Sequence, residues 1–210
     1  MTWIVVFVVF VLGAAIAENV WRARAHRFID AWVFDESVLK GLRATYPMLT
    51  PEQQALVLEG LRDFLHICRQ ARMKGVSMPS KVVDEAWHGF ILSTRHYRAF
   101  CRRAFGRYLN HHPAETMKST TQASKGLRRA WQFACRREGI DPAKPDRLPR
   151  LFALDGQLMI AGGFIYALDC MAAGQTGTYC ASAIGCSSGC SSGCGADGGC
   201  SGDGGGCGGD

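Results

Sequence analysis

No lysine or arginine occurs in residues 1–21 or 180–210 of this chain of 210 residues, although it has 24 basic residues and a net charge of +6. All of the basic residues and 15 of the 18 acidic ones lie in residues 1–179, which gives that part a net charge of +9. No phosphate-binding loop ending in G-K-[ST] is present, which argues against a P-loop nucleoside triphosphatase. Close glycine spacings occur in the C-terminal tail without a strand-to-helix switch, so they predict neither a dinucleotide site nor a nucleophile elbow.

No C-x2-C pair occurs among the ten cysteines, so the spacing does not predict a zinc ribbon or knuckle. Cys68, Cys101 and Cys135 fall on apolar stripes of predicted helices, and we interpret them as core residues. Six more thiols lie in a tail made mostly of Gly, Cys and Ser, and they could capture metal, form disulfides or sense redox state. These tail thiols are Cys180, Cys186, Cys190, Cys194, Cys200 and Cys207. Residues 173–210 are predicted to be a disordered low-complexity tail, because they have too few apolar groups to offset the entropy of ordering.

The N-terminal segment contains sixteen residues without charge, Thr2 to Ala17. Extended to Trp21, a helix would be about 30 Å long, which matches the hydrocarbon thickness of a bilayer. Ala15-Ile16-Ala17 resembles a signal-peptide cleavage site, but no basic residue precedes the apolar run, and a buried core helix is the third alternative. Three arginines follow the segment, so we predict a single-pass anchor with the N-terminus outside and the body in the cytoplasm.

The middle of the chain has mainly helical patterning, and we expect a mostly α fold with one short β-hairpin. Thr50-Pro51-Glu52-Gln53 is a helix start, and the helix is predicted to run to about Met73 with Asp63, His66 and Arg69 facing solvent. Further helices are predicted from Pro79-Ser80, over Thr94–Phe105 and over Lys125–Glu138. Gly162-Gly163 lies between apolar runs and predicts a hairpin near residues 157–168. The predicted parts are an anchor (1–21), a basic juxtamembrane helical segment (22–49), a helical domain (50–172) and the tail (173–210).

The most distinctive stretch is Val83-Asp84-Glu85-Ala86-Trp87-His88, followed by Thr94-Arg95-His96-Tyr97 and by His111-His112-Pro113. Together with the run from Leu148 to Asp155, it resembles the glycine-rich-domain-containing protein-like family in its bacterial form. The resemblance covers roughly residues 35–170. It implies a helical domain in which Val83, Trp87, Arg95 and Tyr97 form a structural motif, and it implies no particular reaction. The nucleic-acid-binding modules of plant members have no counterpart here, and we do not expect a nucleic acid partner.

Asp84 and His88 are four residues apart, so both side chains project from one helix face. A carboxylate and an imidazole in this arrangement can form a structural hydrogen bond, ligate a divalent metal ion, or act together as acid and base. His111 or His112 could add a third ligand from a loop. The residues leave these three interpretations open.

Three functions are therefore carried forward. The leading one is a membrane-anchored helical domain that serves as a binding or assembly module for a protein partner. The second is a metal-dependent enzyme that uses Asp84, His88 and one of His111 or His112, and it requires these groups to converge in the fold. The third is metal handling or redox sensing by the tail thiols.

Overall fold

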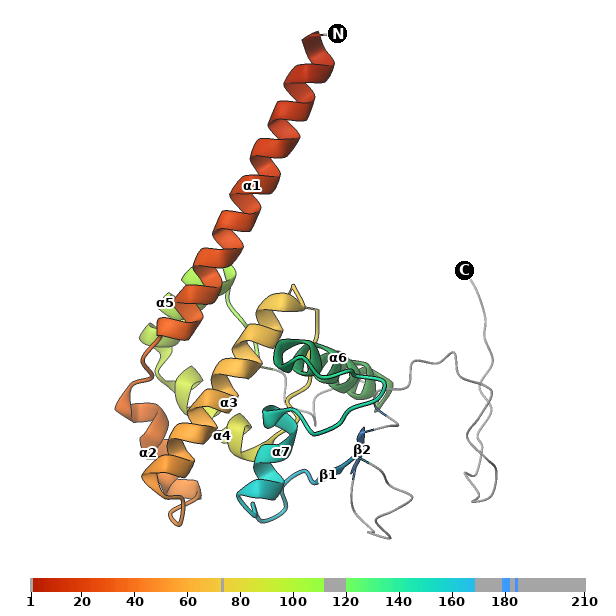
Figure 1. Ribbon diagram of the computed structural model, residues 1–210. Coiled ribbons are helices and arrows are strands. Elements are labelled where there is room, and N and C mark those ends of the chain that lie inside the picture. Colours follow the sequence, from red (N-terminus) through yellow and green to blue (C-terminus); the bar gives the residue numbers. More distant parts are fainter. Residues whose placement is uncertain (1, 73, 112–119, 169–178, 182–183, 185–210) are drawn as a thin grey trace, which may run out of the picture.

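The computed structural model describes residues 2–72, 74–111, 120–168, 179–181 and 184; the side chains of residues 120–124 and of Cys180 are not described. The described part is mostly helical, with seven helices and two short strands (Figure 1). The elements are α1 (Thr2–Ala31), α2 (Glu36–Thr45), α3 (Pro51–Gln70), α4 (Lys81–Leu92), α5 (Thr94–Phe105), α6 (Thr120–Glu138), α7 (Arg150–Gln157), β1 (Tyr166–Ala167) and β2 (Tyr179–Cys180). The predicted disordered tail lies almost wholly outside the described residues.

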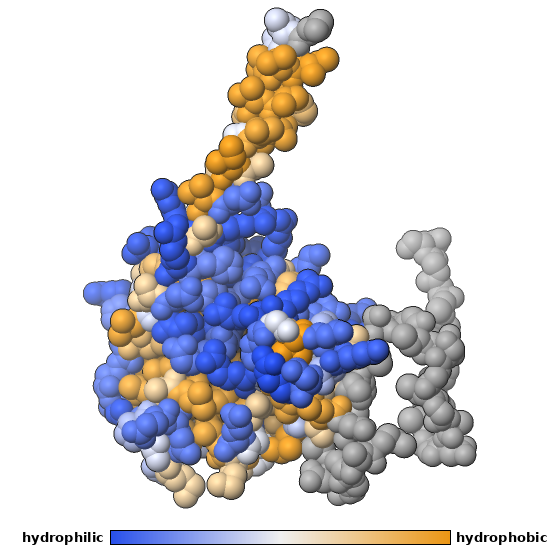
Figure 2. Space-filling view, viewed as in Figure 1, coloured by the Kyte–Doolittle hydropathy of each residue, from blue (hydrophilic) through white to orange (hydrophobic). Residues whose placement is uncertain are grey.

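Helix α1 extends well beyond the helical body and carries the N-terminus at its far end (Figure 1). Its apolar half is long enough to cross a membrane, and none of its most apolar window is buried, which excludes a core helix. A signal sequence has the same length and composition. The other end of α1 belongs to the body, where Ala25 and Ile29 are buried and the helix packs on α3 and α5. Figure 2 shows the apolar helix rising from a hydrophilic face.

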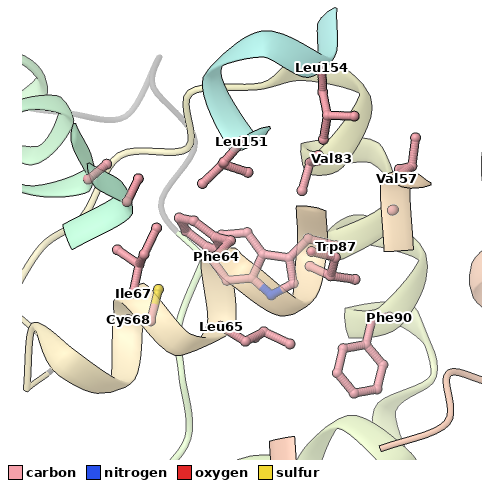
Figure 3. Close-up of a cluster of buried hydrophobic side chains, with 14 of the residues drawn as sticks. Val57, Phe64, Leu65, Ile67, Cys68, Val83, Trp87, Phe90, Leu151 and Leu154 are labelled. Atoms are coloured by element: carbon pink, nitrogen blue, oxygen red, sulfur yellow. The ribbon is translucent and has the colours of Figure 1, made fainter. Parts of the chain in front are cut away.

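The core is built around α3, which packs against α1, α4, α6 and α7. Figure 3 shows Phe64 of α3 and Trp87 of α4 at the centre of this cluster, with Leu151 and Leu154 of α7 on another side. The rings of Phe64 and Trp87 are 4.9 Å apart between centroids. Cys68, Cys101 and Cys135 are buried free thiols, which confirms their interpretation as core residues.

The helix boundaries follow the capping signals in the sequence. Thr50 and Gln53 form the predicted capping box at the start of α3. The side chain of Ser80 accepts a hydrogen bond from the amide of Val83 at the start of α4, and Gly106 ends α5 in the left-handed conformation that glycine favours. Helix α6 begins at Thr120, five residues earlier than predicted.

Two details of the sequence prediction are wrong. Asp63 and His66 do not face solvent but are 4% and 0% exposed, because α1, α6 and α7 cover that side of α3. The small β element is present, but its strands are Tyr166–Ala167 and Tyr179–Cys180, paired in parallel. Gln157 instead ends α7, a helix that begins directly after Pro149.

Candidate functional site: an Asp–His–His cluster on α4

Helix α4 presents Asp84 and His88 on one face, as their spacing predicts. Nδ1 of His88 lies 3.8 Å from Oδ2 of Asp84. This distance is too long for a strong hydrogen bond, so the two side chains stand next to each other without being locked together. The His88 side chain is 43% exposed and that of Asp84 is 30% exposed, so both can be reached from solvent.

His111 arrives at the same place from the segment after α5. Its Nε2 lies 3.0 Å from Oδ1 of Asp84, so the carboxylate has one imidazole near each oxygen. The rings of His88 and His111 are 4.5 Å apart between centroids. Asp84, His88 and His111 each offer one ligand atom, and these atoms lie within 4.8 Å of one another. The fold therefore brings together three of the four candidate ligands, and His112 lies outside the described residues.

A buried hydrogen-bond relay holds His111 in position. The indole Nε1 of Trp87 donates to the hydroxyl of Tyr97 at 3.2 Å, and this hydroxyl donates to the carbonyl of Leu109 at 2.6 Å. Leu109 is two residues before His111, so the relay fixes the backbone that leads to the histidine. The Trp87 ring also packs edge-on against His111, with centroids 4.5 Å apart. The tryptophan and tyrosine of the sequence motif thus position the loop histidine against the helix pair.

The start of α4 is held by a buried carboxylate, that of Asp155 in α7. Oδ1 accepts hydrogen bonds from the Ser80 hydroxyl at 2.7 Å and the Val82 amide at 3.2 Å. Oδ2 accepts from the amides of Lys81 and Phe164, both at 2.8 Å. A negative group at a helix N-terminus satisfies free amides and interacts favourably with the helix dipole. Asp155 is therefore a positioning residue for the helix that carries Asp84 and His88.

The donor set suits a divalent transition metal. Zinc lies about 2.0–2.2 Å from imidazole nitrogen and carboxylate oxygen, so neighbouring ligand atoms of a tetrahedral site are roughly 3.4 Å apart. The two separations from Asp84, 3.0 and 3.8 Å, lie on either side of that value. They are measured to the two different oxygens of the carboxylate, and with one ligand atom from each residue the three donors lie within 4.8 Å, so the side chains would have to draw closer to surround one ion. Two imidazoles and one carboxylate would leave further coordination positions open, and the exposed His88 side lets water or a small molecule reach them.

The other predicted residues have clear locations. Val83 and Tyr97 are fully buried and Trp87 is nearly so. Arg95 is exposed on α5. Cys180 contributes backbone to β2, whereas Cys186, Cys190, Cys194, Cys200 and Cys207 lie outside the described residues, and their predicted roles stay predictions.

Sequence reasoning missed a second set of titratable groups on the covered side of α3. Nε2 of His66 lies 2.6 Å from Oδ1 of Asp30, and Nδ1 of His66 lies 2.9 Å from Nδ1 of His26. Burial, together with the charge of Arg137, lowers the pKa of His66 below its usual value. Its position three residues before Arg69, together with the polar side chains at helical spacing around it, predicted a solvent-facing stripe instead.

The buried carboxylate of Asp63 was missed for the same reason. It accepts hydrogen bonds from Nε of Arg137 in α6 and from Nε of Arg150 in α7, both at 2.8 Å. One side chain thereby joins three helices. Both sets are separate from the Asp84 cluster.

No curated protein and no solved structure matches the chain. One family model does match it, over residues 24–184, which includes every described residue of the Asp84 cluster and of the elements that hold it. The matched region begins after the apolar part of α1. The resemblance to the glycine-rich-domain-containing protein-like family stays a prediction. Because the match covers well over half of its length, the chain belongs to the UCP032817-like family.

Proposed function

We propose that this protein is a membrane-anchored helical domain that binds a divalent transition metal ion through Asp84, His88 and His111. The observation that carries the proposal is the convergence of three ligand atoms within 4.8 Å, one of them from a loop 23 residues after the helix pair. A structural Asp–His hydrogen bond needs only two of these groups. The third group, a second imidazole next to the same carboxylate, supports a ligand set.

The arrangement supports a metal site with catalytic potential rather than a closed structural one. Structural zinc sites have four protein ligands, whereas catalytic sites have three and leave a position for water or substrate. Here the described donors number three, and His88 is substantially exposed. A metal ion with an open position can polarise a carbonyl or phosphoryl group or lower the pKa of a bound water. The proposal therefore includes the metal-dependent enzyme predicted from the sequence.

Membrane anchoring is the second part of the proposal. It is supported by the uncovered apolar half of α1, which continues without a break into the buried end of the same helix. Arg22, Arg24 and Arg27 follow the apolar run, so we propose that the body lies on the cytoplasmic side. A binding or assembly role for the body stays a prediction, and so does a redox role for the tail thiols.

The test is a zinc titration of the full-length protein in a mild non-ionic detergent, after its accessible thiols have been blocked by alkylation. Blocking removes metal binding by the tail, while the buried thiols of the core are protected. We expect one zinc ion per chain. Removing one ligand of three should weaken binding by at least about 100-fold, beyond the 10–100-fold typical of the groups that orient ligands.

The matched control is the exposed His96, which also pairs with an aspartate, with Nδ1 2.6 Å from Oδ2 of Asp35. His96→Ala should leave zinc binding unchanged, while His88→Ala and His111→Ala should each abolish stoichiometric binding. Equal effects of the His96 and His88 substitutions, or no binding by the unsubstituted protein, would contradict the metal site. In that case Asp84 and His111 would form a structural hydrogen bond, and the binding-module hypothesis would take precedence.

A further inference from the structure

A pocket of about 410 Å³ lies where α1 meets the body, next to the apolar part of the helix. Its walls come from α1, from the end of α3 with Arg72 just after it, and from α6. Four arginines line it: Arg22, Arg69, Arg72 and Arg136. Of the described residues that line it, Glu18 alone is acidic. The pocket thus has a clear excess of positive charge.

The arginines of the pocket have few hydrogen-bond acceptors between them. Arg22 pairs with Glu18, and Nη2 of Arg72 lies 3.5 Å from the same carboxylate oxygen. Among the described residues, none accepts a hydrogen bond from Nε or Nη2 of Arg69, and both atoms are buried. Its guanidinium stacks on Trp21, with the central carbon 3.8 Å from the ring centroid. Stacking stabilises the face of the cation but satisfies none of the N–H groups in its plane.

Unpaired buried donors cost free energy, and charged ones cost more than neutral ones. Because the Nε and Nη2 atoms of Arg69 are covered, its side chain would have to turn toward the pocket to donate them to an anion there. The same anion would interact with the neighbouring arginines of the lining. Guanidinium groups bind phosphate oxygens with particular strength, because the planar N–H fork matches the geometry of the anion. The chemistry of the pocket therefore points to a phosphate group.

The location of the pocket indicates the source of that phosphate. Trp21 and Glu18 lie at the end of the apolar run of α1, and tryptophan at such a position is typical of the membrane–water interface. With α1 in a bilayer, the pocket would open at the depth of the lipid headgroups. Figure 2 shows the hydrophilic surface of the body directly below the apolar helix.

We infer that this pocket binds the phosphate group of an anionic phospholipid. The inference rests on the membrane anchoring of the proposed function, and it is independent of the metal site. Arg69 binds the phosphate, with Arg22 and Arg72 next to it. Glu18 competes with the lipid for these two arginines.

The test uses the full-length protein in nanodiscs that contain phosphatidylcholine and phosphatidylglycerol. After gentle delipidation, native mass spectrometry counts the lipids that stay bound. We expect selective retention of one phosphatidylglycerol per chain. Arg69→Gln should reduce this retention about tenfold, which corresponds to about 1.4 kcal/mol. The control Arg147→Gln removes the same charge from an exposed arginine outside the pocket and should have no effect.

A second variant tests the inference through a gain of lipid binding, which a misfolded protein would not show. Glu18→Gln should increase phosphatidylglycerol retention, because it frees Arg22 and Arg72 for the lipid. Equal retention of the two lipids, equal effects of the Arg69 and Arg147 substitutions, or weaker retention in Glu18→Gln would each overturn the inference. Displacement of the lipid by inorganic phosphate at low millimolar concentration would also overturn it, in favour of a free anion. A chain that fails to enter nanodiscs would refute the anchor itself.

Discussion

Asp155 is the residue whose removal should damage the body of the protein most clearly. Its side chain is 1% exposed and accepts four hydrogen bonds, three of them from backbone amides. Asp155→Ala would leave those donors without their acceptor at the start of α4 and at Phe164. A buried donor left unsatisfied costs about 1–3 kcal/mol, and water entering the vacated space will satisfy some of the four. We therefore expect a loss of about 3–5 kcal/mol in the free energy of unfolding, at the upper end for single substitutions.

The assay is urea unfolding of the full-length protein in non-ionic detergent, followed by tryptophan fluorescence. Asp146→Ala is the matched control, since that carboxylate is 73% exposed and pairs with its neighbour Arg147; its effect should stay within about 0.5 kcal/mol. Hydrogen exchange adds a local measurement, because the amides of Lys81 and Val82 should lose protection in Asp155→Ala. Equal stabilities of the two variants would refute the role given to Asp155.

Three further predictions test other parts of the structure. The pKa of His66 is lowered in the folded state, so the unfolded chain takes up the proton first as the pH falls. The free energy of unfolding should therefore fall as the pH drops through about 6.5, by at most about 1.4 kcal/mol per pH unit. Urea unfolding at several pH values measures this slope. Tyr97→Phe removes the hydroxyl between Trp87 and Leu109 and should weaken zinc binding about tenfold with all three ligands intact, as calorimetry would show. Gly89→Ala should destabilise the protein by about 1–3 kcal/mol, because the added Cβ would lie 3.2 Å from the backbone of Val38. Gly41→Ala is the control: its Cβ would make only an ordinary contact, 3.9 Å from Cα of Gly89, and thermal unfolding should show it to be neutral or stabilising.

Each of these predictions has a contradicting result. A pH slope that is the same in His66→Gln as in the unsubstituted protein would assign the acid sensitivity to another group. Unchanged zinc affinity in Tyr97→Phe would show that the relay does not position His111. Equal melting temperatures of the Gly41 and Gly89 variants would contradict the close approach of α2 and α4.

Local signals predicted the helices well because they act within a few residues. The capping box at Thr50, the cap at Ser80 and the left-handed Gly106 are each read from three to five neighbouring positions. The pairing of Asp84 with His88 is likewise local, since it follows from the helical repeat. The sequence offered His111 and His112 as alternative ligands, but it could not show that His111 reaches the pair. That outcome depends on the contact from Tyr97 to the Leu109 carbonyl, which is a property of the packed fold.

The errors lie where several elements surround one helix. Asp63 and His66 belong to a polar stripe that would face solvent on a helix with one covered side, but α3 is covered on several sides. Their partners come from distant segments: Asp30 is 36 positions away from His66, and Arg150 is 87 positions away from Asp63. The strand prediction near Gln157 failed for a related reason, because the apolar residues of α7 pack onto α3 and α4 as a helix.

The most direct test of the metal site is the X-ray absorption spectrum of the full-length protein, loaded with one equivalent of zinc after its accessible thiols have been alkylated. The account predicts nitrogen and oxygen ligands at about 2.0–2.2 Å, with the outer scattering of two imidazoles, and loss of the bound zinc in His88→Ala. A spectrum dominated by sulfur at about 2.3 Å, or one that His88→Ala leaves unchanged, would contradict it.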